Sequence, residues 1–80
     1  MISVLFQKKN RVKSTTFRAE GNNYNEAEEN LMANINYWKA SVQLSGSRLE
    51  IVNMVETRHE VNAVTFVCEA EISYKIHPAA

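Results

Sequence analysis

The sequence contains no aspartate and has little cysteine, proline or glycine. Its one cysteine, Cys68, excludes an intramolecular disulfide and a metal site built from several thiolates. Two glycines and one proline leave few points at which the backbone is broken, which predicts a largely ordered chain. No run of about 20 apolar residues occurs, so we expect no membrane-spanning segment. The short apolar run at the start has no basic leader, so we expect no signal peptide and a reduced, cytoplasmic location.

The length of the chain limits its architecture. Eighty residues predict a single domain over residues 1–80. A domain of this size buries only about 60% of the surface of its unfolded chain, so its stability is marginal unless copies associate. As a small core hydrophobe, Cys68 would contribute to that limited interior.

The segment 62–76 has the clearest strand pattern in the sequence. Its even-numbered side chains from Val64 to Ile76 are mostly apolar, whereas most of the odd-numbered ones are polar. Successive side chains of a strand point to opposite faces, so this alternation predicts a strand with one dry face and one mostly wet face. Fifteen residues make a long strand for a small domain, and a bend or bulge is therefore expected.

A helix is predicted from residue 24 to residue 39. Asn23 and Glu26 have the spacing of a capping box, and further glutamates follow in the first turns, where the helix dipole favours negative charge. Apolar residues then recur at steps of four, four and three, which predicts one buried helix face formed by Ala27, Leu31, Ile35 and Trp38.

The residue pattern of the N-terminal segment, residues 2–20, predicts a hairpin. Residues 2–7 alternate as a short strand, residues 8–11 form a polar turn, and residues 12–20 are rich in strand-forming threonine and phenylalanine. After the helix, residues 40–45 alternate again, so they form either a short strand or a loop held by two apolar side chains.

The segment 48–58 is predicted to be a strand with apolar residues on both faces. Either a bulge switches its faces or both of its sides are covered. Residues 59–62 are expected to turn into the last strand, and we interpret His59 as a solvated turn residue. Pro78 ends the last strand, and residues 77–80 are expected to form a tail.

The predicted fold is α+β. Short connections favour antiparallel neighbours, and the order strand, strand, helix, one or two strands, strand then gives an antiparallel four- to five-stranded sheet with one α-helix packed on one face. One helix is too narrow to cover such a sheet. The apolar residues on the second face of 48–58 therefore predict self-association.

Three short stretches carry a resemblance to a known family: Ala19-Glu20-Gly21, Leu49-Glu50-Ile51-Val52 and Glu56-Thr57-Arg58. They are similar to stretches of the dodecins, small flavin-storing proteins in which a strand, a helix and a long C-terminal hairpin follow in that order. The resemblance implies a topology. It implies no flavin site, because Arg48-Leu49 stands where the flavin-stacking tryptophan would open the second strand, and the glutamine of the last strand is missing. An extra N-terminal strand is a further departure.

Charge is unevenly distributed, although the net charge is zero. Residues 1–19 carry five cations and no acid, whereas residues 20–38 carry four glutamates and no base. Cations on a two-stranded ribbon contact phosphates in nucleic-acid complexes, and they also protect sheet edges from aggregation. The candidate contacts to nucleic acid or to a partner protein are Lys8, Lys9, Arg11, Lys13 and Arg18.

No nucleophile, base and orienting group occur at the spacing of a known motif, so we expect no enzymatic activity, no catalytic residue, no metal site and no cofactor. The sequence by itself does not specify a function. The leading hypothesis is a small non-catalytic interaction protein that binds an unknown protein and also itself, as a homo-oligomer. The alternative is a nucleic-acid-binding protein that uses the basic N-terminal hairpin.

Overall fold

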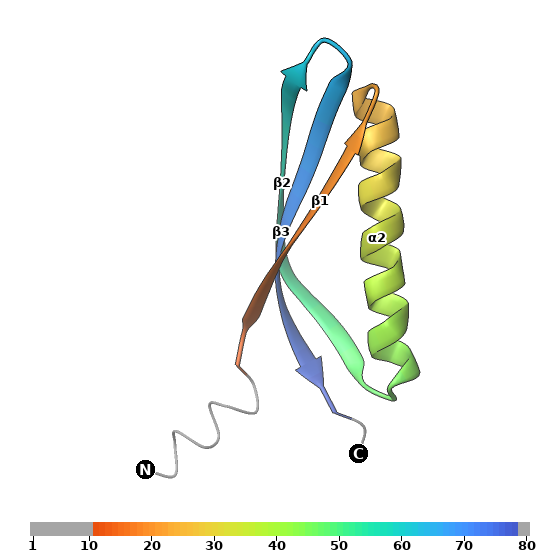
Figure 1. The fold of residues 1–80 in the computed structure, drawn as a ribbon. Helices are drawn as coiled ribbons and strands as arrows, with labels where there is room; N and C mark the ends of the chain where they lie inside the picture. The colour runs from red at the N-terminus through yellow and green to blue at the C-terminus, as the bar shows by residue number, and fades with distance from the viewer. Residues whose placement is uncertain (1–10, 79–80) are drawn as a thin grey trace.

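Residues 11–78 fold into a three-stranded antiparallel sheet with one helix packed against it, as the computed structural model of the chain shows (Figure 1). The elements are β1 (Lys13–Gly21), α2 (Tyr24–Leu44), β2 (Arg48–Asn62) and β3 (Thr65–His77). The prediction of a small α+β protein with an antiparallel sheet is therefore confirmed. The order strand, helix and long hairpin agrees with the topology that the resemblance to the dodecins implies.

The predicted sheet of four to five strands is wrong, because the described residues form three strands in the order β1-β3-β2. Residues 40–45, expected as a strand or a loop, instead continue α2 to Leu44. The helix ends at Leu44, Ser45 is its C-cap, and Gly46 follows with a φ of 86°, a left-handed conformation that glycine adopts at little cost. The predicted strand 2–7 and most of the turn 8–11 lie outside the described residues.

The C-terminal hairpin turns later than the sequence predicts. β2 continues through His59 to Asn62, so residues 63–64 form the turn and the prediction of a turn at 59–62 is wrong. Asn62 Oδ1 accepts a hydrogen bond of 2.9 Å from the backbone N–H of Val64. Asparagine stabilises a turn in this way, which explains why the chain reverses after Asn62.

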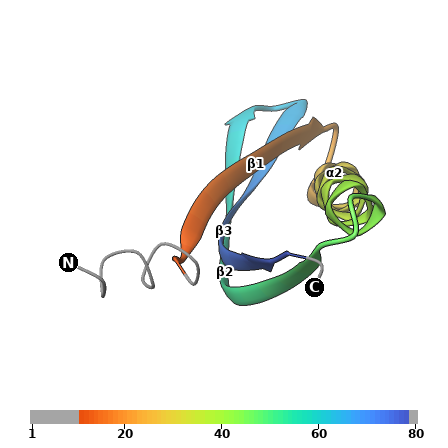
Figure 2. The same cartoon turned by 90° about the horizontal axis from the view of Figure 1, so that it is seen from below.

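The core lies between α2 and the two strands β1 and β3, and Figure 2 shows the helix against one side of the sheet. The buried residues of this cluster are Ala19, Ala27, Leu31, Ile35, Cys68, Ala70 and Ile72. The dry face predicted for β3 is therefore confirmed. Val67 on the other face is also buried, although the alternation predicts that face to be mostly wet; its partners in the ladder are Glu20 and His59.

Both ends of α2 are held by identifiable contacts. At the start, Asn23 Oδ1 accepts a hydrogen bond of 2.8 Å from the N–H of Glu26, and Glu26 Oε1 accepts one of 3.0 Å from the N–H of Asn22. The predicted cap is confirmed, but the Glu26 side chain accepts its hydrogen bond from Asn22 and not from Asn23, as a standard capping box would require. Toward the other end, the Trp38 ring lies 5.3 Å from that of Phe17 and 4.9 Å from that of Tyr74. Trp38 thus packs on the core, as predicted.

A bulge in β2 reorganises its faces. Ile51 pairs with Tyr74, whereas Asn53 pairs with Ser73, so one residue of β2 has no partner in the ladder. Because one inserted residue reverses the alternation, Ile51 and Met54 fall in the same row, on the side of α2. Of the two alternatives for the segment 48–58, the bulge is therefore the confirmed one.

Candidate interaction surface

Three of the five predicted contact cations lie in the described part of the chain. Arg11 precedes β1, Lys13 begins it, and Arg18 lies in its second half. Lys13 pairs with Tyr74 and Arg18 pairs with Glu69, so their side chains point to opposite faces of the sheet. The structure does not bring these two cations into one row.

Arg18 lies among carboxylates. Its Nη1 is 3.1 Å from Glu20 Oε2, and its Nε is 3.9 Å from Glu69 Oε1. Two nearby negative charges reduce the attraction of this guanidinium for a phosphate. Lys8 and Lys9 lie outside the described residues, so the proposed nucleic-acid contact stays a prediction.

The most distinctive surface is the first half of β2. None of the residues of this strand is buried, because α2 packs on β1 and β3 and leaves β2 uncovered at the edge of the sheet. Between 38% and 49% of the area of each of four neighbouring apolar residues is exposed. We call these four residues the apolar edge: Ile51, Val52, Met54 and Val55.

A second exposed apolar group lies at the other end of β2. Val61 lies in β2 just before the turn and Val64 lies in the turn, and they are exposed by 54% and 66%. We call this pair the apolar tip. This pair is not predicted from the sequence, because the turn is predicted at residues 59–62. The ability of Asn62 to stabilise a turn is the signal that would have located the turn correctly.

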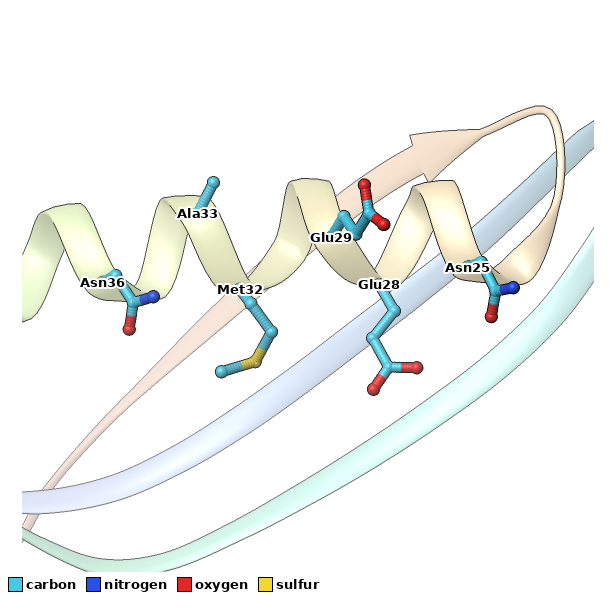
Figure 3. A pocket seen from close by; sticks show the side chains of 6 residues that line it. All are labelled: Asn25, Glu28, Glu29, Met32, Ala33 and Asn36. Atoms are coloured by element: carbon cyan, nitrogen blue, oxygen red, sulfur yellow. The ribbon is translucent and has the colours of Figure 1, made fainter.

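The flank of α2 that faces β2 is hollowed. The hollow holds about 600 Å³ and is lined by Asn25, Glu28, Glu29, Met32, Ala33 and Asn36. In Figure 3, the side chains of Glu28 and Met32 point toward the side of β2 and β3, whereas Ala33 and Glu29 point to the opposite side of the helix. All lining residues come from one helix, so the hollow is an open flank and lacks the converging walls typical of a small-molecule pocket.

Arg58 connects this flank to β2. Its Nη2 lies 2.5 Å from Glu28 Oε2, and its guanidinium lies 5.8 Å from the centre of the Tyr24 ring. Arg58 also contacts Glu56, its neighbour in the same row of β2, at 3.4 Å. The second half of β2 is thus charged on the side of α2, whereas the first half is apolar.

A smaller hollow of about 290 Å³ lies on the opposite face of the sheet, lined by Thr16, Val55, Thr57, Glu69 and Glu71. Its lining is mainly hydroxyl and carboxylate. No group of three His, Cys, Asp or Glu residues in the range 11–78 is placed to hold a metal ion. Val55 belongs to both this hollow and the apolar edge, so an apolar surface and an acidic one meet there.

Cys68 is fully buried beneath α2, and its Sγ lies 4.0 Å from the carbonyl oxygen of Tyr24. Burial raises the pKa of this thiol. Cys68 therefore has the properties of a small core hydrophobe, as the sequence predicts, and not those of a reactive cysteine.

His77 ends β3 and does not belong to a tail. Its Nε2 lies 2.8 Å from Glu50 Oε1 on the neighbouring strand. The hydrogen bond from His77 is the main reason that the pKa of Glu50 lies below its ordinary value of 4.5; desolvation acts in the opposite direction, and the nearby charge of Lys75 lowers it further.

This contact predicts a measurable titration. In His77→Ala, the pKa of Glu50 should rise toward its ordinary value, because the hydrogen bond that favours the carboxylate is lost. Since the native pKa is lowered, the contribution to stability is present above pH 4.5 and is lost as the pH falls through the native pKa. Carboxyl-selective NMR measures the Glu50 pKa in the wild type and in each variant. His59→Ala is the control, and an equal Glu50 pKa in all three proteins would contradict the assignment.

The described residues define a small α+β protein with an antiparallel sheet, and none of its helices is both long and apolar enough to span a membrane. Comparisons with protein-family models, with curated proteins and with solved structures find no match to this chain.

Proposed function

We propose that this chain is a non-catalytic interaction protein that acts by binding other proteins, including a second copy of itself. The supporting observation is where the apolar surface lies. Among residues 11–78, nine large hydrophobic residues are exposed, and six of these lie on β2 or in the turn that follows it. Single exposed apolar side chains are ordinary, but a group confined to one strand is typical of a binding surface.

The position of α2 is the physical cause of this exposure. Within residues 11–78, α2 packs mainly on β1 and β3 and leaves most of β2 uncovered. Binding of another chain would remove the apolar edge from water and would add to a small core. A reduced, cytoplasmic environment belongs to the same proposal and is supported by the single cysteine of the sequence.

Sedimentation velocity of the full chain, from low to high micromolar concentration, tests the proposal. We expect the sedimentation coefficient to rise with concentration. A chain that stays strictly monomeric at high micromolar concentration would contradict self-association.

The same protein should be titrated with labelled single- and double-stranded DNA and RNA. Salt-sensitive binding that is lost in an Arg11→Glu variant would favour the nucleic-acid hypothesis, because contacts between cations and phosphates weaken steeply with salt. Absence of binding, or binding that does not respond to salt, would remove that hypothesis.

A further inference from the structure

The outer edge of β2 is a long, unpaired strand edge. Within residues 11–78, β2 has β3 as its one sheet neighbour, so the main-chain groups on its other side have no partner in the sheet. Its ladder with β3 is regular from Asn53 to Glu60, between two register shifts. An exposed edge of this kind is a template for pairing with another strand.

Two bulges interrupt the ends of β2, and the segment between them leaves the edge open to such pairing. Proteins commonly block an exposed edge with lysine or proline, and Arg48–Asn62 contains neither. The regular segment carries both signs of charge, with Glu56 and Arg58 in one row on the side of α2. A strand with charges of both signs can be complementary to a second copy of itself when the two copies run antiparallel.

Charge limits the possible registers of that pairing. In an antiparallel pair related by a two-fold axis at Thr57, Glu56 of each copy lies opposite Arg58 of the other, and the two Thr57 residues face each other. Opposite charges and Thr–Thr pairs are both favourable across strands. An axis at Glu56 or at Arg58 would instead place identical charges opposite each other, which is destabilising. An axis at His59 would pair Arg58 with Glu60, but it would place Thr57 opposite Val61 and lose the Thr–Thr pair.

The same register brings part of the exposed apolar surface together. An axis at Thr57 places residue 63 opposite Ile51 and residue 62 opposite Val52, so Val61 and Val64 of one copy lie diagonally beside these two residues of the other. The other two residues of the apolar edge lie opposite polar residues, with Met54 facing Glu60 and Val55 facing His59.

We propose that two copies of this chain pair antiparallel through the outer edges of β2, with the two-fold axis at Thr57. The proposal rests on the proposed self-association and specifies its surface. The two three-stranded sheets join into one continuous sheet of six strands, with both helices on the same side. The occupant of the β2 edge is therefore β2 of a second copy, and the apolar tip of that copy lies beside Ile51 and Val52.

The size of this interface indicates a reversible dimer. The strand residues 51–62 span about 40 Å at about 3.3 Å per residue, and a contact roughly 10 Å wide would bury roughly 800 Å² over both copies. Specific interfaces begin near this size, and weak ones dominate there. We therefore expect a micromolar dissociation constant.

Cysteine cross-linking tests the position of the axis. Under mild oxidation, Thr57→Cys should form a disulfide-linked dimer, because two identical residues on the axis lie directly opposite each other. The matched control is Thr16→Cys, at an exposed threonine of β1 on the same face of the sheet. Cys68 stays in both proteins, because it is buried. Equal cross-linking of the two variants would overturn the proposal.

Charge reversal tests the register independently. Glu56→Arg should weaken dimerisation about tenfold, since it places like charges together at both symmetric contacts. The double variant Glu56→Arg/Arg58→Glu should recover most of this loss, because it restores opposite charges across the axis. Sedimentation measures the dissociation constants, and circular dichroism verifies that each variant is folded. A double variant as weak as Glu56→Arg would contradict the register.

The possible results separate the two proposals. A wild-type chain that remains monomeric overturns both self-association and the β2 pairing. A dimer that neither cross-links at Thr57 nor responds to the charge changes keeps self-association and overturns the β2 pairing. If a variant lacking residues 1–10 dimerises and the full chain does not, the N-terminal segment covers the β2 edge, and a second copy is the wrong occupant.

Discussion

Leu31→Ala should lower the free energy of unfolding by about 3 to 4 kcal/mol, which is within the usual range for a buried leucine replaced by alanine. Leu31 is fully buried and lies in the core cluster between α2 and the sheet. The loss combines the transfer free energy of the removed methyl groups with the cavity that remains. A domain of this length is typically stable by several kcal/mol, so a large part of its folded population should be lost.

Leu44→Ala is the matched control, because it makes the same chemical change at a side chain that is 87% exposed. We expect an effect of at most about 0.5 kcal/mol. Urea unfolding followed by Trp38 fluorescence gives both values, and all proteins must be compared at one chain concentration because association adds to apparent stability. Equal losses in the two variants would mean that the core is not where the structure places it.

Gly21→Ala should cost about 3 kcal/mol, at the upper end of the range for overpacking. Gly21 ends β1 where the chain turns into α2, and an added Cβ would lie 2.5 Å from the backbone nitrogen of Ala27 and 2.9 Å from the carbonyl carbon of Glu26. Backbone atoms in a capped first turn cannot move aside as a flexible side chain would. The helix would have to shift away from the sheet, and packing of the core would suffer.

Gly46→Ala is the comparison for this prediction, because it alters the other glycine of the chain for a different reason. Gly46 has a positive φ of 86°, so alanine there should cost about 1 kcal/mol from backbone strain alone. Thermal unfolding by circular dichroism should rank the variants wild type, Gly46→Ala and Gly21→Ala in order of decreasing stability. A Gly21→Ala protein as stable as the wild type would show that α2 lies farther from β1 than the structure indicates.

Sequence alone located the elements whose signal is local and repeated. The start of α2 follows from Asn23 and Glu26, and its buried face follows from apolar residues at helical spacing. The dry face of β3 follows from a period-two pattern sustained over its length. In these segments local preference and tertiary packing favour the same structure, and sequence reasoning succeeds there.

The errors occurred where the local signal is short or ambiguous. Val42 and Leu44 alternate over too few residues to distinguish a strand from the last turn of a helix, and Gly46 decided where α2 ends. The turn was misplaced because the polar residues near His59 resemble a loop, although they form the charged part of an exposed edge strand. An edge strand needs no continuous dry face, so its pattern is weak.

The candidate surface was predictable only in part. Apolar residues on both faces of 48–58 are visible in the sequence, and they led to the hypothesis of self-association. That Ile51 and Met54 share a row depends on a bulge, and that β2 lies at an edge depends on strand order. Both are properties of long-range pairing, which a single sequence does not reveal.

The buried position of Cys68 makes its reactivity a measure of local opening and of unfolding. The only thiol of the chain lies in β3 against the Tyr24 carbonyl, beneath the first turn of the helix. A thiol reagent can reach the sulfur only during moments when the helix lifts or the chain unfolds. The rate at which a thiol reagent modifies Cys68 in the wild-type protein therefore reports how often these openings occur, and no probe has to be introduced.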